Sequence, residues 1–217
     1  MRVSVHGVRG TLLALPLAVI PRLRQDSGFS AVELLIVVAI VGSMAAIGLP
    51  LSSGMIDDMK IKGDAQGLSA AVAQTKLTAA AKFTRARLFL NLAANTYRIQ
   101  TWNRTGTPGW VNANEDLYLS DRAQFGFGLA TVPPPNTQVS LGQAPACLDD
   151  LNVEISSTAC VLFNSRGVSV TAAGLVATTQ ALYLAGPSGT YGIILGATGQ
   201  LQVWHTTQAG LSSWKQR

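Results

Sequence analysis

The chain carries its longest apolar run near the N-terminus. Residues 34–49 include no charged side chain over sixteen positions, and Pro50 ends the run. Counted from Phe29, the stretch has 21 residues, and a helix of that length spans about 30 Å, the thickness of a bilayer's hydrocarbon core. A buried core helix would show a polar face, whereas this run offers only Ser43. The pattern predicts a transmembrane helix over residues 29–50.

Residues 51–84 predict an amphipathic continuation of this helix. Gly63 and Gly67 weaken the prediction, because each costs a helix about 1 kcal/mol relative to alanine. We expect the C-terminal half of one long helix to pack on another element. The larger apolar side chains available for this packing are Ile56, Met59, Leu68, Val72 and Leu77.

From Arg85 onward the apolar residues form short extended runs. Residues 85–91 and 96–102 flank an Ala-Ala-Asn connection and predict a β-hairpin. Turn signals, such as the three prolines and the asparagine at 133–136, separate the later runs. Those runs lie at 115–119, 123–127, 159–163, 168–170, 180–184, 191–195 and 201–205. The predicted fold class is α+β, with the long N-terminal helix packed on an antiparallel, β-rich head formed by residues 85–217.

Composition agrees with a folded chain that includes an apolar segment. Only 12% of the 217 residues are charged, which is less than the usual fraction of about 25%, and the mean hydropathy is +0.29. These values exclude intrinsic disorder and coiled coil for most of the chain. The net charge is +5, but residues 1–28 hold +3 of it and leave +2 on the remaining 189. Charge therefore does not by itself indicate a nucleic-acid partner.

The charges on either side of the apolar helix predict its orientation. Arg22 and Arg24 come just before it, and Asp57 and Asp58 are the first charged residues after it. By the positive-inside rule, the N-terminus lies in the cytoplasm and the head lies outside.

Glu33 is unusual because it places a carboxylate inside the apolar helix. Near the centre of a bilayer such a residue costs about 2.5–3.5 kcal/mol, so it usually has a partner and a function. Two local explanations remain open. Glu33 lies at the membrane interface, or it suits the positive end of the helix dipole.

Residues 24–40 combine Gly28, Phe29 and Glu33 with an uninterrupted apolar helix. This combination resembles the class III leader and N-terminal helix of type IV pilins and type II secretion pseudopilins. The resemblance implies that residues 1–28 are a leader, which a prepilin peptidase removes after Gly28. It also implies N-methylation of Phe29 and a role for Glu33 in assembly. Physically, the new Phe29 amine can pair with Glu33 of a neighbouring subunit, where either charge alone would be costly.

The leader departs from the short, basic form that is common in this family. It includes a ten-residue apolar run at 11–20 with an internal proline, which is too short to span a bilayer. The run could serve as the hydrophobic region of a secretory signal, but no small-x-small cleavage site follows it before Gly28. A start codon assigned too far upstream and a long genuine leader both remain open.

The head resembles, more loosely, the GspH/FimT type of minor pseudopilin. The resemblance rests on residues 161–167 and on the closing runs at 191–195 and 199–203. It implies a minor subunit at the filament tip or in initiation rather than a major one. Arg166 lies in the first of these segments, and we interpret it as a solvated turn residue.

Cys147 and Cys160 lie thirteen positions apart in the predicted head. An exported head would lie in an oxidising compartment, where a disulfide would close a loop worth about 3 kcal/mol. Two free buried thiols are the alternative. A metal site would need two further ligands, and we interpret the nearby Asp149, Asp150 and Glu154 as loop residues. We therefore expect neither a metal nor a cofactor.

The sequence gives little support to an enzyme. His6 would be lost with the leader, which leaves His205 alone on a predicted strand. No phosphate-binding glycine loop, glycine-framed serine or metal-ligand spacing is present. The leading hypothesis is a structural subunit of the bacterial inner membrane, whose partners are other pilin or pseudopilin subunits, the prepilin peptidase and lipid.

Two other functions stay open. The first is DNA binding for uptake, since some pilins of this type capture DNA. Its candidate contacts are Arg98, Arg104, Arg122, Arg166, Lys215 and Arg217, with Trp102, Trp110, Trp204 and Trp214 for stacking. Against it, Gln200 stands where DNA-binding relatives tend to carry arginine. The second is a membrane anchor for a periplasmic binding domain that never polymerises, which predicts no processing at Gly28.

Overall fold

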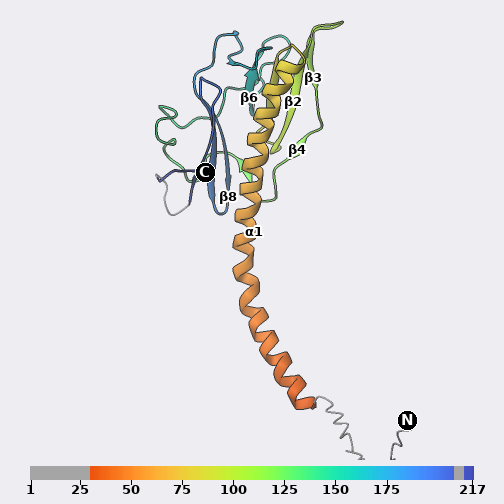
Figure 1. Cartoon of the computed structure of the whole chain (residues 1–217), viewed down its shortest axis with the longest axis vertical. Coiled ribbons are helices and arrows are strands. Elements are labelled where there is room, and N and C mark those ends of the chain that lie inside the picture. The colour runs from red at the N-terminus through yellow and green to blue at the C-terminus, as the bar shows by residue number, and fades with distance from the viewer. Residues whose placement is uncertain (1–29, 208–212) are drawn as a thin grey trace, which may run out of the picture. The chain divides into compact units, whose positions relative to one another are not determined.

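The computed structural model describes residues 30–207 and 213–217, apart from the side chains of 47–53. The chain divides into two compact units, Met1–Ala45 and Ala46–Arg217. The leader, Gly28 and Phe29 lie outside the described residues, so the cleavage and methylation expected there stay predictions. One helix, α1 (Ala31–Ala81), contributes to both units (Figure 1).

The first unit contributes the beginning of α1. Ser30 caps it: the amide N–H of Val32 donates to Ser30 Oγ at 3.3 Å, and that of Leu34 donates to the Ser30 carbonyl at 3.1 Å. Among the described residues, no helix combines the length and the apolar character needed to cross a membrane. The predicted transmembrane segment, residues 29–50, extends beyond the described side chains and stays a prediction.

In the second unit, one face of α1 is buried. Its buried residues are spaced alternately by four and three positions, as expected for a helix that packs on one side. They are Ile61, Ala65, Leu68, Val72, Thr75 and Ala79, and Ala71, next to Val72, is buried as well. The prediction was correct for Leu68 and Val72 and wrong for Ile56, Met59 and Leu77, which are at least half exposed. The buried face uses small residues because they let strands approach the helix closely.

The helix ends at Ala81, three residues before the predicted boundary. Phe83 takes the left-handed conformation with φ of 49°, and the amide of Thr84 donates to the Ala79 carbonyl at 3.2 Å. This arrangement is the Schellman motif, which usually has glycine where Phe83 stands. Thr84 Oγ1 then donates to the Trp102 carbonyl at 2.8 Å, which fixes the chain at the start of the sheet.

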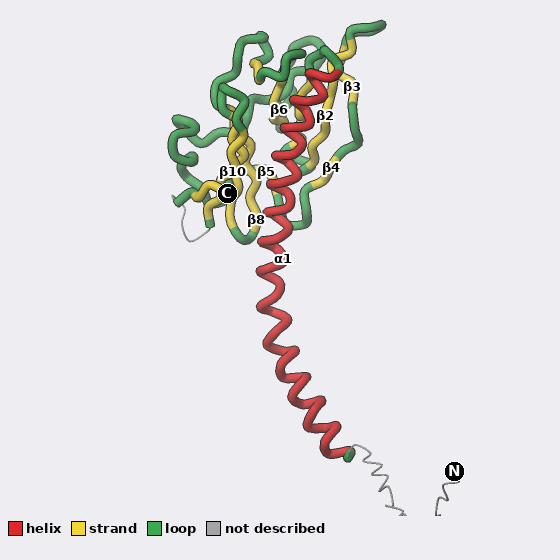
Figure 2. Tube along the Cα trace, viewed as in Figure 1, coloured by secondary structure: helices red, strands yellow, loops and turns green. Residues whose placement is uncertain are grey.

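The strands form two antiparallel sheets (Figure 2). In the first sheet the order is β3-β2-β1-β6-β7, and β4 also pairs with β2. Its strands are β1 (Ala86–Asn91), β2 (Thr96–Asn103), β3 (Gly109–Asn112), β4 (Leu117–Tyr118), β6 (Thr158–Phe163) and β7 (Ser169–Val170). In the second sheet the order is β11-β10-β9-β8-β5. Its strands are β5 (Gln124–Phe125), β8 (Gln180–Gly186), β9 (Gly189–Leu195), β10 (Leu201–Thr206) and β11 (Lys215–Gln216).

This architecture confirms the predicted α+β class and the antiparallel pairing. The predicted hairpin is β1 with β2, paired from Ala86↔Thr101 to Asn91↔Thr96. The runs at 115–119 and 123–127 shorten to the two-residue strands β4 and β5. Strands β3 and β11 were not predicted.

A single core joins the buried face of α1 to both sheets. Leu68 of the helix shares this core with Leu88 of the first sheet and Ile193 of the second. Gly186, at the end of β8, lets this strand lie close to α1, because a Cβ at that position would lie 2.7 Å from Ile61 Cδ1. The second unit is therefore organised around the C-terminal half of α1.

We predict that Leu68→Ala lowers the free energy of unfolding by about 2–5 kcal/mol, because Leu68 is fully buried. Leu77→Ala is the matched control: Leu77 is 68% exposed, and its truncation should change stability by less than about 0.5 kcal/mol. Denaturant unfolding of the detergent-solubilised chain measures both. Equal losses in the two variants would contradict the orientation of the helix.

Candidate functional site

Glu33 lies in the first turn of α1, with its side chain exposed. It stands three residues after the capping Ser30, in the Ser-x-x-Glu pattern of a capping box. A carboxylate here is favoured by the helix dipole. The structure therefore places Glu33 at the positive end of the helix dipole, which was one of the two explanations left open by the sequence. Its carboxylate is accessible to another molecule.

The α1 segment of the first unit exposes apolar side chains on all its faces. Every side chain from Ala31 to Ala45 is exposed, and the large apolar ones range from 49% at Ile40 to 70% at Met44. A contiguous apolar surface of this kind marks contact with lipid or with other protein chains. The segment is thus suited to burial outside its own chain.

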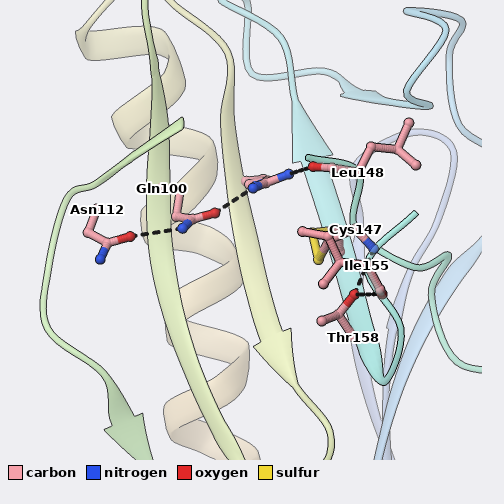
Figure 3. The surroundings of a disulfide bond; sticks show 8 residues. Gln100, Asn112, Cys147, Leu148, Ile155 and Thr158 are labelled. Carbon is pink, nitrogen blue, oxygen red and sulfur yellow. Dashed lines mark hydrogen bonds between the residues drawn. A yellow bond between two sulfur atoms is a disulfide. The ribbon is translucent and has the colours of Figure 1, made fainter. Parts of the chain in front are cut away.

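Cys147 and Cys160 form a disulfide, with an S–S distance of 2.02 Å and Cα atoms 5.0 Å apart. Cys160 belongs to β6, and Cys147 lies in the segment that precedes it. Thr158 stabilises the same connection: its Oγ1 accepts from the amide of Cys147 at 3.0 Å and donates to the Ile155 carbonyl at 2.6 Å (Figure 3). We refer to residues 147–160 as the disulfide loop.

The outer face of the first sheet carries a group of arginines and aromatic rings. Alternation along β1 places Ala86, Leu88 and Leu90 in the core, so Arg85 and Arg87 lie on the opposite face. On the neighbouring strands, Trp102 and Trp110 stand directly opposite each other, with ring centroids 5.2 Å apart and nearly perpendicular planes. We call Arg85, Arg87, Trp102 and Trp110 the arginine–tryptophan cluster.

Guanidinium groups cover the two tryptophan rings. Arg85 Cζ lies 4.6 Å from the centre of Trp102 and 5.9 Å from that of Trp110. Arg87 Cζ lies 4.0 Å from the centre of Trp110. These distances are within the range of cation–π attraction. The cluster is therefore rigid and carries two positive charges against aromatic surfaces.

Arg87 is 5% exposed and is held at two points. Its Nε donates to Gln100 Oε1 at 2.7 Å, and its Nη1 donates to the Leu148 carbonyl of the disulfide loop. Gln100 in turn donates to Asn112 Oδ1 at 2.8 Å, so the chain of hydrogen bonds crosses three strands and ends on the loop (Figure 3). Burial lowers the pKa of Arg87 to about 10, an effect that Asp150 partly opposes. Arg87 stays cationic at neutral pH.

A cavity of about 640 Å³ lies between the cluster and the disulfide loop. Its lining includes all four cluster residues, Asp149 and Asp150 of the loop, and Cys160. The volume falls in the range of ligand-binding pockets. The arrangement offers two cations, two carboxylates and apolar walls, which suits binding of a small polar group rather than chemistry on it.

Of the predicted DNA contacts, the structure brings Trp102 and Trp110 together, while two of the arginines pair with carboxylates. Arg98 pairs with Asp116 at 2.9 Å, and Arg122 pairs with Asp57 at 2.6 Å. Trp214 is buried and donates to the Val132 carbonyl at 2.9 Å. The other predicted basic contacts, Arg104, Arg166, Lys215 and Arg217, are exposed.

Trp102 and Trp110 were predicted as stacking contacts, whereas Arg85 and Arg87, which the structure places over them, were not predicted. Their position could have been predicted from the sequence, because these arginines alternate with apolar residues in a predicted strand. In a half-buried strand that pattern puts both cations on the face away from the core.

His205 is buried on β10, and its ring stacks on Tyr191 with centroids 4.4 Å apart. Its Nε2 has no hydrogen-bond partner among the described residues. Burial lowers its pKa, with a further contribution from Arg217. Over the part of the chain that the structure describes, no group of three His, Cys, Asp or Glu side chains is placed to hold a metal ion.

Comparisons with known proteins find similarity at the level of structure. No protein-family model and no curated protein matches the chain. The minor pseudopilin EpsH from the Type 2 Secretion System of Vibrio cholerae is similar in structure, with a TM-score of 0.44 and 12% sequence identity. The match covers 66% of this chain and 95% of that one.

We predict that replacing both cysteines, Cys147→Ala with Cys160→Ala, lowers the free energy of unfolding by about 3 kcal/mol. Denaturant unfolding measures the loss, and wild-type chain unfolded with a reductant is the control that should match it. A thiol assay on the non-reduced, denatured chain should find no reactive cysteine. Two reactive thiols would contradict the disulfide.

Stability should fall as the pH drops below about 6.5, the usual pKa of histidine. Burial lowers the pKa of His205 in the folded chain, so the unfolded chain takes up the proton first and unfolding becomes more favourable. Thermal unfolding at pH 7 and pH 5 measures the effect. His205→Phe keeps a ring against Tyr191 and should lose less stability over that interval; an equal loss would rule out His205 as the cause.

Proposed function

We propose that this chain is a minor pilin or pseudopilin, a structural subunit and not an enzyme. It is processed after Gly28 and assembled into a type II secretion pseudopilus or a type IV pilus. One observation carries the proposal: α1 begins with a segment that is apolar on every exposed face and bears a single carboxylate, Glu33, in its first turn. A helix of this kind needs an apolar environment outside its own chain.

Before assembly, that environment is the inner membrane, with the head in the periplasm as the flanking charges favour. After assembly, it is a bundle of the same helices from neighbouring subunits. Transfer from lipid to bundle keeps the apolar surface covered, so the large apolar area is not an obstacle to polymerisation.

Glu33 and the processed N-terminus give the bundle its polar contact. Cleavage after Gly28 creates a positive amine at Phe29, four residues before Glu33. Because both groups are costly when unpaired in an apolar bundle, an incoming subunit is favoured when its charge meets the opposite charge of its neighbour. The exposed position of Glu33 supports this role.

We assign the chain to a minor position, at the tip or in initiation, on the basis of the GspH/FimT resemblance of its head. The DNA-uptake alternative is less favoured because Arg98 and Arg122 are already paired with carboxylates. A non-polymerising anchor would leave the leader intact.

Glu33→Gln should reduce recovery of the subunit in filaments by about tenfold or more, because it removes one partner of a buried charge pair. Glutamine also suits the third helical position of a capping box, so the helix start is preserved. Immunoblotting of sheared filaments against total membrane protein measures recovery. Glu115→Gln, at an exposed site of the head, makes the same change and should assemble normally.

Mass spectrometry of the membrane-extracted chain separates assembly from processing. Wild type and Glu33→Gln should both begin at Phe29, with a methyl group on the wild-type amine. Normal filament recovery of Glu33→Gln would refute the role of its charge, and an intact leader on the wild type would favour the plain anchor.

A further inference from the structure

The cavity beside the disulfide loop contains two cations without a carboxylate partner. Ion pairs in the described part of the chain are Arg98–Asp116 and Arg122–Asp57. Asp149 and Asp150 line the same cavity, but neither comes within the 4.0 Å that defines an ion pair with Arg85 or Arg87. The positive charge is therefore not neutralised by direct contact within the cavity.

Both arginines keep donors free. Arg87 uses Nε and Nη1 for Gln100 and Leu148, and its Nη2 donates to none of the described residues. Arg85 is half-buried, and its guanidinium lies over Trp102 and near Trp110 and donates no hydrogen bond to the described residues. A ring face attracts a cation but does not replace a hydrogen-bond acceptor. Both arginines thus line the cavity with N–H groups that no described residue accepts.

The acidic residues of the loop have other uses. Asp149 Oδ1 accepts from the amides of Leu151 and Val153, both at 2.8 Å. Asp150 Oδ1 accepts from the amide of Trp110 at 2.9 Å, which ties the loop to β3. Both carboxylates belong to residues that line the cavity, and their charge discourages a ligand with several negative groups.

We propose that this cavity binds one carboxylate of a peptide segment from another protein, an aspartate or glutamate flanked by apolar residues. Arg85 and the free side of Arg87 bind the carboxylate, because guanidinium and carboxylate match in bidentate geometry. Leu148, Leu162 and Val170 in the lining contact the apolar neighbours. The site lies wholly in the second unit and does not depend on assembly through Glu33.

A peptide fits the site better than a nucleic acid. Stacking of bases needs open aromatic faces, and the rings of Trp102 and Trp110 already carry guanidinium groups. A phosphate backbone also needs a continuous basic surface, whereas two carboxylates line this cavity together with the two arginines.

Binding can be measured on the full chain in detergent with the blocked tripeptide acetyl-Leu-Glu-Leu-amide, by calorimetry. Its glutamine analogue, acetyl-Leu-Gln-Leu-amide, is the matched ligand control, and should bind about tenfold more weakly or worse because it lacks the charge. Sodium acetate tests the carboxylate alone and should bind far more weakly than the peptide. Equal affinities for the glutamate and glutamine peptides would overturn the proposal. If acetate bound as tightly as the glutamate peptide, the site would recognise a carboxylate alone, and the claim that it binds a peptide would be overturned.

Arg85→Gln should weaken binding of the glutamate peptide by about tenfold without unfolding the head, since Arg85 donates no side-chain hydrogen bond to the described residues. Arg166→Gln, an exposed turn residue outside the cavity, is the matched control and should bind like wild type. Asp150→Asn keeps an acceptor for the Trp110 amide and removes a negative charge, so it should bind the glutamate peptide several times more tightly.

Unchanged binding in Arg85→Gln, or weaker binding in Asp150→Asn, would contradict the proposed site. A single-stranded oligothymidine measured in parallel decides between the two classes of partner. Oligonucleotide binding that exceeds peptide binding and is lost in Arg85→Gln would replace the peptide with a nucleic acid. Absence of such binding supports the peptide.

Discussion

The packing of one helix face against two sheets is the interaction on which the head depends. The buried face of α1 is built from Ile61, Leu68 and Val72, with small residues between them, and it joins a core that includes Leu88 and Ile193 from different sheets. Neither sheet could bury its inner face without this helix. The helix that begins as an exposed apolar segment therefore ends as the centre of the second unit.

The first sheet uses its two faces for different purposes. Alternate residues of β1 enter the core, and the residues between them bring Arg87 to the outer face. There a hydrogen-bond chain through Gln100 fixes the guanidinium over Trp110. Because the inner face is anchored by the core, the outer face can hold a buried cation in a defined position, which is the condition for selective recognition of an anion.

Local patterns predicted the parts of the structure that local forces determine. The hairpin, the strands at 180–184 and 191–195, and the helix followed from periodicity and turn residues. The buried face of α1 did not, because Ala65 and Ala79 pack through their small size rather than their hydrophobicity. The arginine–tryptophan cluster also lay beyond prediction: Arg87 and Leu148 are 61 residues apart, and only the sheet register and the disulfide loop bring them together.

The Leu148 carbonyl that holds Arg87 follows Cys147 directly in the chain. One wall of the cavity is therefore positioned in part by a covalent bond that forms and persists in oxidising environments. The amide of Trp110 donates to Asp150 and Arg87 donates to Leu148, so the disulfide is one of several links that hold the loop beside Arg87. The shape of the cavity thus depends on the redox state of its surroundings as well as on the packing of the core.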